Sequence, residues 1–481
     1  MSAPTSPAAG ADRLEVVDAL RGFALFGVFW ANLLVFAGIG YMAGEQRAAR
    51  FPGALDRAAY LLERFFVENK FIGLFSVLFG ISFWLFVSRA GASGRGGTAR
   101  FYRRVAWLFV IGAVHGALWW GDVLRFYALW ALLLPLFARV APGRLLAIAL
   151  SVGVLAPALV AGARAWSPAP APATADFDAL VLAAFSEGDS GEMMAANLRY
   201  DAYLTFSWGH VAYELAVFGR LLLGLYVART LPLGSLAASR SLLWRVVLVG
   251  VPVGAIGSTV FALLPRIRDD APLVFARRLV IEAGQFGLTL AYAAGLVLVF
   301  LSPRWGRAAR GLAPIGRMAL TWYLSQTMFG LWMFYGFTGG PALMGDVGPA
   351  ALLALAVLGF GLQLVLARLW LGHFRFGPAE WLWRTLTYGK RQRLRVSLAA
   401  SLAVALLTAA HPAGGAGRLL PAGHRGRSSR PDAAVSGPVH ERSLAWTTRR
   451  HADLAYRTEV VRKVGHAADH AGQLDVADLT G

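Results

Sequence analysis

Cysteine is absent from this chain of 481 residues, and charged residues are scarce. Without a thiol the chain has no disulfide bond, no thiolate metal site and no cysteine nucleophile. Only 15% of the residues are charged, whereas an ordinary soluble domain carries about 25%. Since 57% of the residues are hydrophobic, water is not the main solvent of this protein.

The formal net charge is +19, which in a soluble chain suggests nucleic-acid binding. Here the basic residues gather in short connections between long apolar runs, as cytoplasmic loops of membrane proteins do. We therefore exclude nucleic acid as a partner and expect the lipid bilayer to surround the chain.

Ten apolar runs are near the length of about 20 residues that a helix needs to cross a bilayer. They lie at 22–42, 69–88, 104–121, 123–141, 144–163, 203–228, 243–264, 279–301, 314–338 and 349–371. The sequence therefore predicts an all-α, polytopic transmembrane bundle of about ten spans. The third and fourth runs are separated by a tight turn at Gly121–Asp122, which predicts a helical hairpin.

Arginines fix the expected orientation. They cluster after the second, fourth, sixth and eighth runs and again after the last one, so these connections fall on one side of the bundle. The positive-inside rule then places both termini in the cytoplasm of a multi-pass protein of the cytoplasmic (inner) membrane. The segment 164–200 lies outside; Arg277 and Arg278 on that outer side run against the pattern.

The composition changes after Arg395. Residues 1–395 are expected to form the transmembrane domain, with an N-terminal part at about 13–163 and a C-terminal part at about 203–395. Residues 396–481 are rich in Arg, His, Asp and Gly without periodicity, which predicts a disordered or artefactual tail. Six of the nine histidines fall there without metal-ligand spacing, so we predict no metal site.

Polar groups in hydrocarbon need a partner or a purpose, because a charged one costs about 2.5–3.5 kcal/mol on insertion scales. Asp18 and Arg21, three residues apart, can pair on one helix face. This pair either sets the topology or positions a ligand through Arg21. Asn32 lies in the middle of the first run, and Lys70, one of three lysines, either snorkels to the interface or contacts a ligand.

His115 and Asp122 are seven residues apart, about two helical turns, so both point the same way if the helix continues through Gly121. They are either packing residues or a general-base pair, in which the carboxylate fixes the imidazole tautomer and raises its basicity. His210 and Glu214, at i and i+4, share another helix face at similar depth. With Glu282, these groups suggest a polar cavity that opens outward. Arg317 and Gln326 add polar groups to the ninth run.

Two separated signatures carry a family resemblance. They are Asp18-Ala-Leu-Arg-Gly-Phe-Ala-Leu-Phe-Gly27 with Asn32, Lys70, Phe75-Ser-Val-Leu-Phe-Gly80, His115 and Gly121-Asp122 at one end, and Gly316-Arg-Met-Ala-Leu-Thr-Trp-Tyr-Leu-Ser-Gln326 with Gly377-Pro-Ala-Glu380 at the other. Over about residues 13–395 the chain resembles the YeiB-like family of uncharacterised bacterial membrane proteins (domain of unknown function 418).

That family is similar to membrane acyltransferases, which use a cytoplasmic acyl donor and a membrane-embedded histidine. The resemblance implies that His115 is the general base and Asp122 its orienting partner, while Arg21 and Lys70 contact donor or acceptor. The expected reaction moves an acyl group from a cytoplasmic thioester, acyl-coenzyme A, to an outward-facing glycan or lipid headgroup. No permanently bound cofactor is expected, and the sequence does not indicate an oligomeric state.

Two alternatives remain open. In a proton-coupled transporter or exporter of a small molecule, the same buried groups line a substrate pathway. In a non-catalytic scaffold, they pair with one another. Under either active function, the residues expected to contact substrate are Arg21, Asn32, Lys70, His210, Glu214, Arg317 and Gln326.

Overall fold

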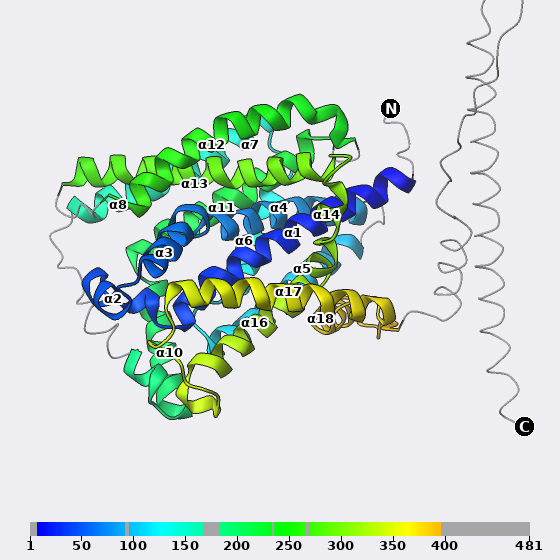
Figure 1. Ribbon diagram of the computed structural model, residues 1–481. Helices are drawn as coiled ribbons and strands as arrows, with labels where there is room; N and C mark the ends of the chain where they lie inside the picture. The colour runs from blue at the N-terminus through cyan, green and yellow to red at the C-terminus, as the bar shows by residue number, and fades with distance from the viewer. Residues whose placement is uncertain (1–6, 92–95, 167–181, 233–234, 265–269, 396–481) are drawn as a thin grey trace, which may run out of the picture. The chain divides into compact units, whose positions relative to one another are not determined.

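The computed structural model describes residues 7–91, 96–166, 182–232, 235–264 and 270–395. These residues are almost entirely helical (Figure 1). The long helices are α1 (Pro7–Phe36), α4 (Lys70–Gly91), α5 (Gly96–Leu118), α6 (Leu124–Phe137), α10 (Ser190–Thr205), α11 (Trp208–Thr230), α12 (Arg240–Ala262), α13 (Ala271–Phe300), α16 (Ala319–Phe334) and α17 (Pro349–His373). The shorter ones are α2 (Gly44–Arg50), α3 (Ala54–Phe66), α7 (Pro142–Leu150), α8 (Ala156–Trp166), α14 (Gly306–Arg310), α15 (Ala313–Arg317) and α18 (Pro378–Tyr388).

Every one of the ten apolar runs is helical, so the all-α prediction is confirmed. Within the described residues, seven helical segments are long and apolar enough to cross a membrane. They are Glu15–Phe36, Ala54–Ser88, Pro142–Trp166, Trp208–Thr230, Leu236–Ala262, Ala271–Phe300 and Pro349–His373. Of the other three expected spans, α6 and α16 have only 14 and 16 residues. The number of ten spans therefore remains a prediction.

The outer helices expose large apolar side chains, as a bilayer requires. Val249 on α12 is 64% exposed and Leu358 on α17 is 72% exposed. Water would make such surfaces costly, whereas lipid tails solvate them. The chain is an integral membrane protein on these grounds.

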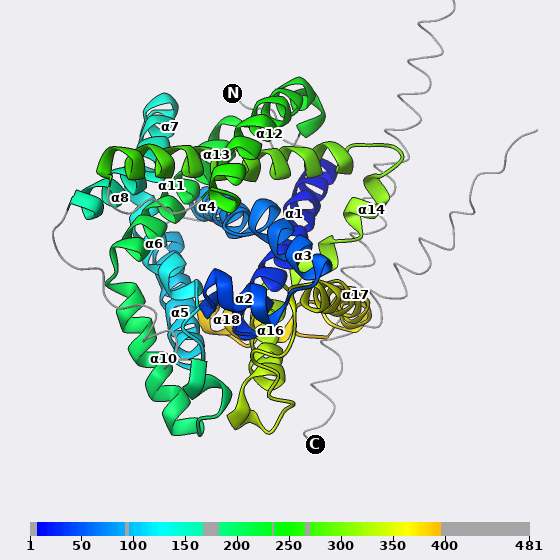
Figure 2. The same cartoon turned by 60° about the vertical axis from the view of Figure 1, so that its left-hand side comes forward.

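Helix α1 runs between α13 on one side and α17 on the other (Figures 1 and 2). Its first half packs in a core with α4, α11 and α13, and its second half in a core with α15, α16 and α17. This central position explains why α1 is two-thirds buried although its composition suits lipid.

The two helices α4 and α11 cross at glycines. A Cβ on Gly80 would lie 2.0 Å from the carbonyl oxygen of Leu221, and one on Gly224 would lie 2.0 Å from that of Val77. Only glycine fits at both positions, so the backbones approach closely, as small residues permit in membrane bundles. This crossing brings the buried charges of α11 into the middle of the molecule.

By its contacts the chain divides into residues 1–395 and 396–481. The predicted tail, 396–481, lies outside the described residues, so its interpretation stays a prediction.

Candidate functional site

The hairpin between α5 and α6 brings His115 and Asp122 together, but not in the way the spacing suggested. Helix α5 ends at Leu118, so it does not continue through Gly121. The turn that follows folds Asp122 back, and its Oδ1 lies 2.9 Å from Nδ1 of His115. Both residues are 3% exposed.

The sequence of the turn explains this geometry. Asp122 accepts hydrogen bonds from the backbone amides of Leu124 (3.2 Å) and Arg125 (2.9 Å), the first amides of α6. A short acidic side chain before a helix commonly satisfies these otherwise unpaired amides. Gly112 lets the two helices approach, since a Cβ there would lie 2.4 Å from the nitrogen of Arg125. The turn and the amides of α6 therefore hold Asp122 in place independently of its hydrogen bond to the imidazole.

A third group completes a chain of hydrogen bonds. Thr327, fully buried on α16, places its Oγ1 2.9 Å from Nε2 of His115. The ring of Tyr323, one turn earlier on α16, lies 5.0 Å from the imidazole between centroids. Helices α5 and α16 thus contribute an Asp122–His115–Thr327 array in which carboxylate, imidazole and hydroxyl follow one another.

The partners of His115 determine its tautomer. Asp122 receives two backbone N–H groups and acts there as an acceptor, so the proton between Asp122 and His115 is assigned to Nδ1. Nε2 is then the acceptor, and the hydroxyl of Thr327 donates to it. An imidazole arranged in this way is able to take a proton from a hydroxyl group.

Helix α10 packs against α5 beside this array. Asn197 is buried; its Oδ1 accepts from the amide of Trp120, and its Nδ2 donates to the carbonyls of Gly116 and Ala117. On the next turn of α10, Asp201 forms a two-pronged ion pair with Arg125, of which one contact measures 2.7 Å. Both connections tie α10 to the hairpin that holds His115.

His210 and Glu214 share a face of α11, as predicted. Nε2 of His210 lies 3.6 Å from Oε1 of Glu214, which is too long for a hydrogen bond. Glu214 instead accepts a hydrogen bond of 2.6 Å from the indole of Trp130 on α6. Arg125 lies within electrostatic range of both residues, so it connects this pair with Asp122.

A second buried cluster lies deeper on α11. Arg220 is 1% exposed and donates to Glu282 (3.2 Å) and Gln285 (3.1 Å), both on α13. Arg278 approaches the other oxygen of Glu282 at 2.6 Å. Glu282 is therefore shared by two guanidinium groups and does not belong to the His115 array.

The structure corrects the snorkelling interpretation of Lys70. This side chain is fully buried, and its Nζ donates to the backbone carbonyl of Arg64 at 2.6 Å. Its ammonium also lies 5.0 Å from the ring centroid of Phe261. Lys70 closes the break between α3 and α4 instead of reaching for the interface.

The remaining predicted site residues lie apart from His115. Arg21 forms the expected ion pair with Asp18 at 2.6 Å and also donates to Ser82 of α4. Arg317 is exposed, and Asn32 is partly buried in α1. Gln326 is buried and donates to Gln363 of α17 at 3.0 Å. The structure thus separates the predicted residues into several groups.

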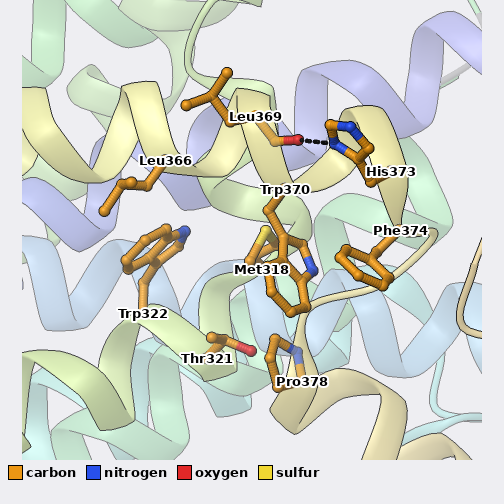
Figure 3. A pocket seen from close by; sticks show the side chains of 9 residues that line it. All are labelled: Met318, Thr321, Trp322, Leu366, Leu369, Trp370, His373, Phe374 and Pro378. Carbon is orange, nitrogen blue, oxygen red and sulfur yellow. Dashed lines mark hydrogen bonds between the residues drawn. The ribbon is translucent and has the colours of Figure 1, made fainter.

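Two cavities among the described residues lie away from His115, so the outward-opening polar cavity stays a prediction. A cavity of about 400 Å³ lies between α16, α17 and α18, and its walls are mostly apolar (Figure 3). They consist of Met318, Thr321, Trp322, Leu366, Leu369, Trp370, His373, Phe374 and Pro378. A cavity of about 110 Å³ between α1, α4, α11, α12 and α13 is entirely apolar.

Neither cavity is lined by His115, His210, Glu214 or Glu282. His115, Glu214 and Glu282 are buried. Among the described residues, no group of three or more His, Cys, Asp or Glu side chains is arranged to hold a metal ion.

Sequence reasoning missed Thr327, Asn197 and the Arg125–Asp201 pair. Thr327 is 212 residues from His115, and a threonine in an apolar helix gives no periodic signal. Asn197 and Asp201 did give a periodic signal, since they are four residues apart on one face of a helix.

The comparisons with known proteins find one family model and several uncharacterised relatives. Residues 227–390 match the family model described as "Protein of unknown function (DUF418)". The uncharacterized protein YxaH of Bacillus subtilis is 28% identical over 397 residues, covering 78% of this chain and 94% of the relative.

Two other relatives are similar over most of their length. An uncharacterized 39.9 kDa protein in the amylase 3' region of Bacillus acidopullulyticus is 29% identical, covering 80% of this chain and 96% of the relative. The uncharacterized protein YeiB of Escherichia coli is 28% identical, and the match covers 78% of this chain and 96% of the relative. No solved structure matches the chain. Residues 227–390 thus match the DUF418 family model, and most of the chain is similar to the uncharacterised proteins YxaH and YeiB.

Proposed function

We propose that this protein is a membrane acyltransferase that moves an acyl group from a cytoplasmic thioester, such as acyl-coenzyme A, to a hydroxyl of an outward-facing glycan or lipid headgroup. The observation that carries this proposal is the Asp122–His115–Thr327 array. In the tautomer assigned above, Nε2 accepts from a hydroxyl, which is the interaction that a general base makes with an acceptor alcohol.

In the proposed reaction, the acceptor hydroxyl takes the place of the Thr327 hydroxyl at Nε2 of His115. Its proton passes to Nε2 while its oxygen bonds to the thioester carbonyl carbon. The carbon–sulfur bond then breaks, and the leaving thiolate takes the proton back from Nε2. Asp122 stabilises the imidazolium that exists between these two steps.

The topology is part of the proposal. With about ten spans and both termini in the cytoplasm, the turn that carries Asp122 faces the outer half of the cytoplasmic membrane. Arg21 and Arg317 then lie near the cytoplasmic side, where the donor enters. Positioning of donor and acceptor in a bundle closed to water accounts for much of the expected rate.

The test is an acyl-transfer and thioester-hydrolysis assay with purified full-length protein. His115→Ala should lower the rate by about 10²–10⁴-fold, the usual contribution of general-base catalysis. His373→Ala is the matched control, because this exposed histidine lies outside the His115 array and its Nδ1 lies 3.0 Å from the carbonyl oxygen of Leu369. Equal activity of wild type and His115→Ala contradicts the proposal.

A proton-coupled transporter is the second candidate, favoured by the buried Arg220–Glu282–Arg278 cluster. Such intramembrane charges often mark a substrate or proton pathway. A transporter shows neither hydrolysis nor acyl transfer in the assay above. Uptake into sealed vesicles driven by a pH gradient, and abolished in Glu282→Gln, would favour this candidate instead.

A further inference from the structure

Three arginines lie near one aspartate at the end of the bundle that we expect to be cytoplasmic, and a fourth arginine lies near two of them. Asp18, at the beginning of the membrane span of α1, pairs with Arg21 at 2.6 Å. Arg317 at the end of α15 and Arg384 of α18 lie within electrostatic range of Asp18. Arg104 of α5 lies within range of both Arg21 and Arg384. We call Arg21, Arg104, Arg317 and Arg384 the arginine cluster.

Close packing holds these helices together, so the charges cannot simply move apart. Gly316 of α15 lies directly against the carbonyl oxygen of Asp18, where no Cβ would fit. The guanidinium of Arg104 stacks on the ring of Trp383, 3.7 Å from its centroid, and the indole of Trp383 donates to the carbonyl of Arg104. Helices α1, α5, α15 and α18 therefore form a fixed frame around the cluster.

Nearby carboxylates do not balance the cluster. Glu15 of α1 forms an ion pair with Arg310 at 3.7 Å. Glu380 of α18 accepts from the amides of Leu320 and Thr321 and from the hydroxyl of Thr321. Among the described side chains that lie within electrostatic range of Asp18, three are arginines and none is a second carboxylate.

Four guanidinium groups with one carboxylate leave an excess of about three positive charges in a partly buried space, where like charges repel strongly. The side chains of Arg21 and Asp18 are only 27% and 19% exposed, so water screens them incompletely. A bound anion with several oxygens relieves this repulsion, and phosphate groups suit the planar, five-donor guanidinium best.

We propose that the arginine cluster is a binding site for a phosphate-bearing ligand at the cytoplasmic end of the bundle. The proposal deepens the proposed function, on which the choice of ligand rests: coenzyme A carries three phosphate groups on the part of the donor far from the thioester. The same chemistry occurs in the headgroup of an anionic phospholipid and in free phosphate, so the test separates these sources.

The test measures binding to full-length protein by calorimetry, with three probes: coenzyme A, dihexanoyl phosphatidylglycerol below its micellar concentration, and inorganic phosphate. Arg317→Gln and Arg384→Gln should each raise the Kd of coenzyme A about tenfold, which corresponds to about 1.4 kcal/mol. Arg317 is exposed, so its replacement leaves the helix packing intact.

Arg245→Gln is the matched control. Arg245 is an exposed residue of α12 outside the arginine cluster, so this substitution removes the same charge without changing the cluster. Weaker binding in both cluster variants with an unchanged Kd in the control supports the site. If only the phospholipid or only inorganic phosphate binds more weakly to both cluster variants, the phosphate site stands, and that probe represents its ligand. Absence of binding by all three probes, or an equal loss in Arg245→Gln, overturns it.

Acyl-transfer kinetics distinguish this proposal from the proposed function. If the wild type binds coenzyme A through the arginines but transfers no acyl group, the acyltransferase proposal fails and the site stands. If the wild type transfers acyl groups and both cluster variants keep its KM for the donor, the arginine cluster does not bind the donor and the acyltransferase proposal stands.

Discussion

At the scale of single residues, His115 is unusual because both ring nitrogens have side-chain partners of different character. Asp122 accepts a hydrogen bond from the N–H at Nδ1, and the hydroxyl of Thr327 donates a hydrogen bond to Nε2. A histidine with a merely structural role requires only that its nitrogens be satisfied. A general base requires this order, with the carboxylate behind the imidazole and the hydroxyl in front.

Replacement of Thr327 distinguishes direct transfer from a covalent intermediate. In the proposed reaction its hydroxyl only occupies the acceptor's place, so Thr327→Val should lower acyl transfer by less than about tenfold, the size of one lost hydrogen bond of about 1 kcal/mol. Intact-protein mass spectrometry with donor alone should find no acylated protein. Loss of activity by 10²-fold or more, together with an acyl group on Thr327 in the wild type, would instead make Thr327 the nucleophile.

At the scale of elements, the contacts between α16 and its neighbours decide where Thr327 lies. Glu380 of α18 accepts from the backbone amides of Leu320 (2.6 Å) and Thr321 (3.1 Å), which are among the first amides of α16. It thereby caps a helix to which it does not belong, and a carboxylate there also interacts favourably with the helix dipole. The hydroxyl of Thr321 then connects Glu380 with the amide of Ala379.

This cap makes stability depend on pH. Burial raises the pKa of the Glu380 carboxyl above its ordinary value of 4.5, although hydrogen bonds from Thr321 and Leu320 oppose the shift. The folded state then holds the proton more tightly than the unfolded state, so this contribution is complete below pH 4.5 and is lost as the pH rises through the raised pKa.

In Glu380→Gln that pH dependence is absent. Thermal unfolding in nanodiscs from pH 4 upward should show the wild type losing stability relative to Glu380→Gln as the pH increases. The difference between the two proteins removes the contribution of every other titrating group. A wild type that gains relative stability with pH would mean that the hydrogen bonds outweigh burial.

At the scale of the whole molecule, the sequence was informative where a local pattern decides the outcome. The hydrophobic runs of membrane length predicted the all-helical architecture, and the i, i+4 spacing predicted that His210 and Glu214 share a face. The His115–Asp122 pair formed although its assumed cause, a continuous helix, was wrong, since a turn brings the two together.

What the sequence did not reveal depends on contacts between distant segments. Thr327 reaches His115, and Arg220 reaches Glu282, only after α16 and α13 have packed into the bundle. The outward cavity was predicted from groups at similar depth. Depth alone does not tell whether such groups surround water or find separate partners. Here Glu214 bonds to Trp130 and Glu282 to Arg220, while His115 bonds to Asp122 and Thr327.

The absence of cysteine makes the predicted topology directly testable, because single cysteines can be introduced without removing any. Glu187 and Arg391 are exposed and lie on opposite sides of the membrane if both termini are cytoplasmic. In intact cells an impermeant maleimide should label Glu187→Cys but not Arg391→Cys, and both should react after the membrane is opened. The cysteine-free parent reports background labelling. Labelling of Arg391→Cys in intact cells would reverse the orientation, and His115 would then lie nearer to the cytoplasm than acyl transfer to an outer acceptor requires.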